Sequence, residues 1–260
     1  MNYAKAIFLG LVQGLTEFLP VSSSGHLVLF QRILGIKGDM LLFDIVLHLG
    51  TLLAVLIVFR KDLWECIKRP FGKTTLSLII ATIPAISIAL FFGGFIEKTF
   101  SGGYLGFGFL ITAGLLFAGQ KAANYKLQIT NYKLGFKGAV IIGLFQGAAL
   151  LPGISRSGAT VCGGLLSGAE KDSAARFSFL MSVPVILGAA ARELFKLRTV
   201  TQSAGALPLF LGFLFAALAG FVSIKFMLGI IKKARFWLFS IYLFLLGGFV
   251  LLNQYVFLWF

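Results

Sequence analysis

Near the N-terminus, the segment QGLTEFLPVSSSGH places an acid, a run of serines and a histidine close together. The carboxylate of Glu17 can hold a metal ion or move a proton, and His26 titrates near neutral pH, so it can act as a base or an acid. Between them, Ser22, Ser23 and Ser24 supply hydroxyl groups, one of which could be an activated nucleophile. The segment therefore combines proton-transfer groups with a nucleophile.

A second segment, LPGISRSGAT, offers a grip for an anion. Its candidate ligands are Ser155, Arg156, Ser157 and Thr160, around the start of an expected helix. Free backbone N–H groups at a helix N-terminus, hydroxyls and a guanidinium fork are what an oxyanion such as phosphate requires. One serine could instead cap the helix, but capping leaves an arginine between two serines unexplained.

Together the two segments indicate hydrolysis of a phosphate ester or anhydride. The alternative is that Glu17 and Arg156 form a buried structural ion pair. Asp44 and His48, four residues apart on one helix face, could be supporting residues or metal ligands, or His48 could simply pack. The chain contains no Walker A, HExxH or paired CxxC motif, and GISRS lacks the closing glycine of a nucleophile elbow.

The composition places these polar residues in a membrane protein. Of 260 residues, 58% are hydrophobic and 12% are charged, against about 45–50% and about 25% in an ordinary soluble domain. The net charge of +14 is spread over short runs between long apolar stretches. This pattern indicates membrane loops and not a nucleic-acid-binding face. We therefore expect the lipid bilayer as a partner and no nucleic acid.

The hydrophobic segments predict the fold, because a membrane-spanning helix needs about 20 mostly apolar residues. Six segments fit: Met40–Phe59, Thr74–Ile96, Tyr104–Gly119, Ser173–Ala191, Leu207–Ile231 and Arg235–Phe257. Two shorter regions are broken by Pro, Gly and Ser: Ala4–Leu19 with Leu27–Leu34, and Gly138–Leu151 with Thr160–Leu166. Broken segments are typical of re-entrant hairpins. We predict an all-α polytopic membrane protein with six transmembrane helices and two re-entrant helical hairpins.

The distribution of Lys and Arg predicts the orientation. If both termini are extracytoplasmic, basic residues are about twice as frequent in the cytoplasmic loops as in the external ones, as the positive-inside rule expects. The basic loop 120–137 is then cytoplasmic. The cluster from Arg192 to Arg198 runs against the rule.

The two broken regions also repeat one another at a constant offset of 133 positions. The coinciding residues of the first copy are Gly10, Gln13, Gly14, Ser22, Ser24, Gly25 and Gly35. Three expected spans separate the copies, so the copies would enter from opposite faces. We predict a single integral membrane domain, 1–260, built as an inverted repeat with halves of about 1–119 and 138–260 and a site near the membrane midplane.

Both motifs resemble those of one family. The first is similar to a Glu/Gln-xxx-Glu motif followed by Ser-Ser-x-Gly-His, and the second to Pro-Gly-x-Ser-Arg-Ser-x-x-Thr, in the bacterial undecaprenyl-diphosphate phosphatases of the bacitracin-resistance type. The resemblance continues through RFSFLMSVPVILGA and more loosely to the end. It implies hydrolysis of undecaprenyl diphosphate to inorganic phosphate and undecaprenyl phosphate, the carrier lipid for cell-wall precursors. It also implies the bacterial plasma membrane, an inverted repeat with two re-entrant hairpins, and a site open to the extracytoplasmic side.

The resemblance assigns roles by position. Glu17 is the motif's second acid, His26 its histidine and Ser23 the candidate nucleophile. The substrate-binding residues would be Gln13, Ser22, Ser155, Ser157 and Thr160, with Arg156 gripping the phosphate. Gln13 stands where the motif also allows an acid, and its amide can only hydrogen-bond or ligate through the carbonyl. A divalent ion is implied, and we expect Mg²⁺ or Ca²⁺ between Glu17 and phosphate oxygens.

Three alternatives stay open. Either Ser23 or a water could attack the phosphorus. A transporter or flippase for a polyprenyl phosphate lipid is the rival class, since secondary transporters are often inverted repeats with broken helices. Such a carrier would need the Arg156 grip but not Ser23 and His26 together. The small-residue face GAVIIGLFQGAA could pack helices, which leaves a homodimer open.

Overall fold

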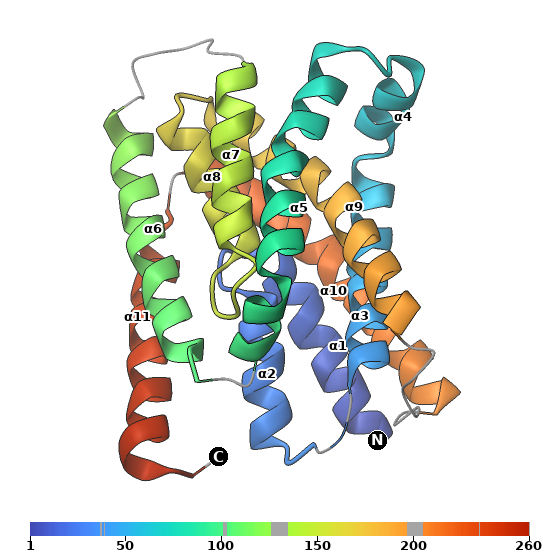
Figure 1. Ribbon diagram of the computed structural model, residues 1–260, viewed down its shortest axis with the longest axis vertical. Helices are drawn as coiled ribbons and strands as arrows, with labels where there is room; N and C mark the ends of the chain where they lie inside the picture. Colours follow the sequence, from blue (N-terminus) through green and yellow to red (C-terminus); the bar gives the residue numbers. More distant parts are fainter. Residues whose placement is uncertain are drawn as a thin grey trace.

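The computed structural model describes residues 1–36, 38, 40–100, 103–125, 135–196, 205–233 and 235–259, which are mostly helical and contain no β-strand. The helices are α1 (Tyr3–Phe18), α2 (Ser23–Ile33), α3 (Leu41–Val58), α4 (Arg60–Lys68), α5 (Lys73–Thr99), α6 (Leu105–Tyr125), α7 (Phe136–Ala148), α8 (Arg156–Leu166), α9 (Lys171–Lys196), α10 (Ala206–Lys232), α11 (Trp237–Leu252) and the π-helical turn η3 (Asn253–Phe257). Both chain termini lie at the same end of the molecule (Figure 1).

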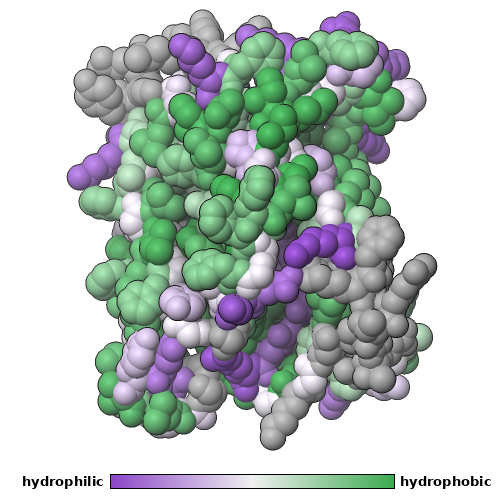
Figure 2. All heavy atoms as spheres, in the orientation of Figure 1, coloured by the Kyte–Doolittle hydropathy of each residue, from purple (hydrophilic) through white to green (hydrophobic). Residues whose placement is uncertain are grey.

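Six helices in the described ranges are long and apolar enough to cross a membrane. They are Leu41–Val58, Lys73–Thr99, Leu105–Asn124, Lys171–Arg192, Ala206–Ile231 and Trp237–Phe257. Each corresponds to one predicted span, so the prediction of an all-α polytopic membrane protein is confirmed. Figure 2 shows hydrophobic side chains over much of one face, with hydrophilic side chains along its upper edge and in its lower part.

Loop regions add detail to the prediction. The charged segment after α3 forms the short helix α4, because Leu63, Trp64 and Ile67 recur at helical spacing among its charged residues. Helices α6 and α7 take up the two ends of the predicted basic loop 120–137. Its residues 126–134 lie outside the described residues, as does Arg198.

The two broken regions form two helix pairs, α1–α2 and α7–α8. Helix α1 ends at Phe18 because the following residue precedes Pro20, and a residue before proline disfavours the helical conformation. Helices α2 and α8 each begin four residues before the predicted starts at Leu27 and Thr160. The reason is the same in both copies, since a serine hydroxyl accepts a hydrogen bond from the helix's first free N–H groups.

The helix pairs approach from opposite ends and meet by their tips. In Figure 1, α1 and α2 lie in the lower half and α7 and α8 in the upper half, and the connecting turns meet at mid-height. The Ser157 hydroxyl donates to the Leu19 carbonyl over 2.9 Å, which joins the two tips. On the far side, the Thr112 hydroxyl of α6 donates to the Gly153 carbonyl and accepts from the Ser155 N–H. Gly153 has a φ of +86°, a conformation that glycine adopts readily.

Glycines allow each pair to pack tightly on a long helix. A Cβ at Gly10 or Gly14 of α1 would collide with the backbone of α10. At the matching positions of α7, a Cβ at Gly143 would collide with the backbone of α5, and one at Gly147 with Ile88. Helix α1 therefore packs on α10 and helix α7 on α5. Each of the two helix pairs thus packs against a long helix from the other half of the chain.

Three buried phenylalanines form the centre of the main core beside the first tip. The Phe18 ring at the end of α1 contacts the Phe179 ring of α9 edge-on, with the centroids 5.7 Å apart. The Phe59 ring contacts Phe179 from the other side at 6.0 Å. Because Phe18 follows Glu17 directly, this packing fixes the last turn of α1 and with it the acid.

Candidate active site

Glu17 is the centre of a polar cluster at the junction of the two tips. Its side chain is almost fully buried and receives three partners. The Gln13 amide, one turn earlier in α1, donates to Oε2 over 2.9 Å, and the Ser23 hydroxyl of α2 donates to the same oxygen. The Arg156 guanidinium, at the start of α8, pairs with Oε1. The structure therefore brings together the acid, the candidate nucleophile and the cation that the sequence predicted.

The remaining predicted phosphate ligands of the second tip lie around Arg156 and have partners within the protein. Ser155 caps α8 by accepting from the Gly158 N–H, and Ser157 bonds to the first tip as described. The Thr160 hydroxyl contacts that of Ser178 on α9 at 2.6 Å and donates to the Arg156 carbonyl. Capping thus accounts for Ser155, and Thr160 anchors the first turn of α8, which carries the arginine.

Ser22 has a similar capping position in the first pair. Its hydroxyl accepts from the Gly25 N–H over 3.3 Å and lies 3.4 Å from the Ser24 hydroxyl. Ser22 also has a φ of +69°, which is unusual for a residue with a side chain. The strained turn directs the next residue, Ser23, toward Glu17.

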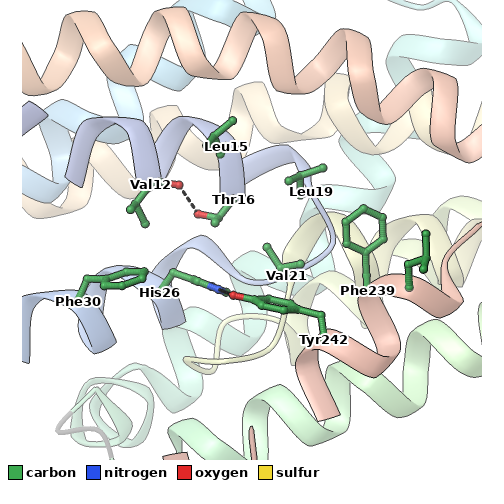
Figure 3. Close-up of a pocket in the computed structure, with 10 residues that line it drawn as sticks. Val12, Leu15, Thr16, Leu19, Val21, His26, Phe30, Phe239 and Tyr242 are labelled. Atoms are coloured by element: carbon green, nitrogen blue, oxygen red, sulfur yellow. Dashed lines mark hydrogen bonds between the residues drawn. The ribbon is translucent and has the colours of Figure 1, made fainter. Parts of the chain in front are cut away.

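His26, also in the first helix pair, has a separate set of partners. Its Nδ1 lies 2.8 Å from the Ser22 carbonyl and must donate to it, so Nε2 of the neutral ring accepts from the Tyr242 hydroxyl at 2.7 Å. The two rings stack at 5.8 Å, and Phe109 contacts the imidazole edge-on. Figure 3 shows His26 and Tyr242 pointing toward one another from α2 and α11.

The histidine that faces Glu17 is His48. Its Nε2 lies 3.9 Å from Glu17 Oε2, and its Nδ1 lies 2.7 Å from the Asp44 carbonyl, to which it donates. The Asp44 carboxylate accepts from the Gln31 amide at 2.8 Å. His48 is therefore a neighbour of the acid, whereas Asp44 links α3 to α2.

Sequence reasoning did not single out Tyr242, the partner of His26, or Gln146 on α7. Tyr242 lies far along the chain in an apolar helix, and no motif marks it. Gln146 is the repeat partner of Gln13, which was a usable signal. Its amide is 1% exposed and has no hydrogen-bond partner on either atom.

Glu17 and Gln13 provide side-chain oxygen atoms, the type of ligand that a hard cation prefers. No group of three His, Cys, Asp or Glu side chains gathers for a metal in the described part of the chain. However, Gln13 Oε1 is buried without a partner beside the Glu17 carboxylate. Two protein oxygens fit an ion such as Mg²⁺, which usually keeps several waters and binds substrate phosphates.

The fold and the site define a class: a polytopic helical membrane protein in which two broken helix pairs bury an acid, a hydroxyl and a guanidinium at their junction. Residues 6–249 match the family described as bacitracin resistance protein BacA. The chain belongs to this family.

Several relatives agree with the chain over nearly its whole length. An undecaprenyl-diphosphatase of Carboxydothermus hydrogenoformans is 46% identical, with 98% of each chain covered. An undecaprenyl-diphosphatase of Halothermothrix orenii is 41% identical, covering 99% of this chain and 100% of the relative. Undecaprenyl-diphosphatase 3 of Bacillus cereus is 38% identical, with 98% of each covered.

Proposed function

We propose that this protein hydrolyses undecaprenyl diphosphate to undecaprenyl phosphate and inorganic phosphate, recycling the lipid carrier for cell-wall synthesis and conferring bacitracin resistance. The family and the names of its relatives support the reaction. The structural observation that carries the proposal is the contact of Ser23 and Arg156 with one carboxylate, that of Glu17.

The mechanism follows from these contacts. The terminal phosphoryl group binds the guanidinium of Arg156, which otherwise pairs with Glu17. The hydroxyl of Ser23, or a water in its place, attacks the terminal phosphorus while His26 or Glu17 takes its proton. The bond from that phosphorus to the bridging oxygen breaks, and undecaprenyl phosphate leaves. With serine as nucleophile, water then hydrolyses the phosphoserine. Because phosphoryl transfer depends mainly on positioning and charge, Arg156 supplies a large part of the rate enhancement.

A divalent ion, Mg²⁺ or Ca²⁺, belongs to the proposal. Glu17 and the free carbonyl oxygen of Gln13 would hold it, together with phosphate oxygens. When bound, it would neutralise phosphate charge that a single arginine leaves uncompensated. Activity should disappear in excess EDTA and return with added Mg²⁺ or Ca²⁺. Full activity in the chelator would contradict this part.

The proposed architecture is an inverted repeat of residues 1–119 and 138–260, with α1–α2 and α7–α8 as re-entrant hairpins. The matched serine caps, the matched glycine contacts and the tips that meet at mid-height support it (Figure 1). The proposed location is the bacterial plasma membrane, with both termini and the site opening extracytoplasmic. Cysteine labelling at Asn2 and at Lys61 from either side of the membrane would test the orientation.

The proposal does not fix the oligomeric state, and light scattering in detergent would show whether the protein forms a homodimer. The small-residue face of α7 that suggested it packs within this chain, because Gly143 and Gly147 face α5.

The decisive experiment is phosphate release from undecaprenyl diphosphate by purified protein in detergent with Mg²⁺, beside Arg156→Ala. Release that vanishes in the variant supports the enzyme. Folded wild-type protein that binds the lipid without releasing phosphate would favour the transporter reading instead.

A further inference from the structure

His48 of α3 presents a free ring nitrogen to the buried acid. Its Nδ1 lies 2.7 Å from the Asp44 carbonyl and must donate to it, so Nε2 of the neutral ring has a lone pair. Among the described residues this Nε2 has no hydrogen-bond partner, and it faces Glu17 Oε2 at 3.9 Å. Two acceptor atoms thus face one another, and a cation between them would bind both.

A third acceptor belongs to the amide that contacts the same carboxylate oxygen. Gln13 donates through Nε2 to Glu17 Oε2 over 2.9 Å, and its Oε1 is buried without a partner. Arg156 pairs with the other carboxylate oxygen, Oε1. The guanidinium and an ion at Oε2 would therefore use different oxygens of one carboxylate.

The backbone contact of His48 is typical of a histidine that binds a metal ion. Such a histidine binds through one neutral ring nitrogen and donates its other N–H to a carboxylate or a backbone carbonyl, which fixes the tautomer and the ring. His26 has the same kind of Nδ1 contact, but its Nε2 accepts from Tyr242 and is occupied. The chain has two histidines, and His48 is the one whose Nε2 is free.

His48 also lies on the accessible side of the acid. Its side chain is 31% exposed, whereas that of Glu17 is 1% exposed. The imidazole is therefore positioned to contact an ion that approaches the buried carboxylate.

We propose that His48 is a ligand of the divalent ion at Glu17, through Nε2, together with Glu17 Oε2 and Gln13 Oε1. The proposal rests on the proposed function for the presence of an ion, and it adds the residue that determines which ion is preferred. Because an imidazole nitrogen favours transition-metal ions over Mg²⁺ and Ca²⁺, the site should bind Mn²⁺ more tightly than either.

Pulsed EPR of bound Mn²⁺ tests the ligand directly, because the echo of this paramagnetic ion is modulated by a coordinated nitrogen. Protein without a histidine tag is labelled with ¹⁵N-histidine, loaded with Mn²⁺ in detergent and compared with unlabelled protein. We expect histidine modulation in the wild type that persists in His26→Gln and disappears in His48→Gln. The spectra need no turnover, so they test the ligand even if the protein releases no phosphate.

Metal affinity gives a second measurement. Glutamine replaces the imidazole nitrogen with a carbonyl oxygen, so His48→Gln should weaken Mn²⁺ binding about tenfold and change Ca²⁺ binding much less. His26→Gln is the matched control and should leave the ratio of the two affinities at its wild-type value.

Three results would overturn the proposal: wild-type protein that binds no Mn²⁺, bound Mn²⁺ without histidine modulation, and modulation that is lost in His26→Gln instead of His48→Gln. The first two use wild-type protein alone, so they decide even if a variant does not fold. Wild-type protein that releases phosphate with Mg²⁺ but shows one of these results would retain the proposed function and lose the role of His48.

Discussion

Arg156, the first residue of α8, pairs with Glu17, in the last turn of α1, across the junction of the two helix pairs. The same carboxylate accepts from Ser23, so one acid contacts both the candidate nucleophile and the candidate phosphate ligand. The structural and the catalytic interpretations of this pair are therefore compatible. A phosphoryl group that binds Arg156 competes with Glu17 for the guanidinium, and where it displaces the carboxylate it leaves Glu17 free to accept a proton.

The first prediction separates the two roles of this pair. Arg156→Ala leaves a buried carboxylate without its cation, and the loss should be about 3–5 kcal/mol of unfolding free energy. The double variant Glu17→Gln/Arg156→Ala should recover much of that stability and still release no phosphate. Denaturant unfolding in detergent and phosphate release are the measurements. A double variant with substantial activity would refute the catalytic roles.

The second prediction concerns the nucleophile. If Ser23 attacks, Ser23→Ala should lose at least about 10³-fold in kcat, and acid quenching of the wild type should trap a phosphoserine. Ser24→Ala is the control, because its hydroxyl lies near Ser22. Substantial activity in Ser23→Ala would leave water as the nucleophile.

The third prediction compares the two histidines. His48→Ala should lower kcat more than Tyr242→Phe does, because His48 faces Glu17 whereas the Tyr242 hydroxyl hydrogen-bonds to His26. Tyr242→Phe keeps the stacked ring and loses one hydrogen bond, worth about 1 kcal/mol of stability. His26→Ala should abolish hydrolysis under the proposed function, whereas a carrier would tolerate it. Steady-state kinetics and lipid-binding measurements distinguish these outcomes.

The fourth prediction concerns the glycine contacts. Gly14→Leu should prevent α1 from seating on α10 and reduce both folded yield and thermal stability, because the side chain would meet the α10 backbone. A Cβ at Gly94 on α5 meets no atom within 4 Å, so Gly94→Leu should be tolerated. Fluorescence-detected size exclusion after heating measures both. Equal stability of the two variants would contradict this account of the packing.

The sequence was sufficient for the spans and for the centre of the site. A long apolar run that crosses a membrane must satisfy its backbone hydrogen bonds internally, as an α-helix does, so the six helices follow from the composition of these runs. Glu17 and Arg156 stood out because a charge at membrane depth is costly without a partner. The divalent ion, the roles of the site residues and the membrane orientation stay predictions.

Other features depend on packing that no local pattern reveals. His48 could be an ordinary core residue until α3 is placed beside α1, and Tyr242 lies in an apolar stretch without any motif. The early starts of α2 and α8 came from serine caps, which shift a helix boundary without changing its hydrophobicity. The catalytic role of His26 stays a prediction, and its contacts with Tyr242 and Phe109 became visible only with the fold.

The contact between α1 and α10 has a consequence for biosynthesis. Gly14 of α1 packs on Ala216 of α10. At a synthesis rate of about 5–20 residues per second, α1 leaves the ribosome roughly 10–40 s before this part of α10 is made. For roughly the first 7–28 s of that interval, at the same rate, Glu17 also lacks Arg156. In this state the chain has a buried acid without its cation and a helix pair without its packing partner, so we expect the membrane-insertion machinery to hold it. A ribosome that stalls before α10 should yield a product that quality-control proteases recognise.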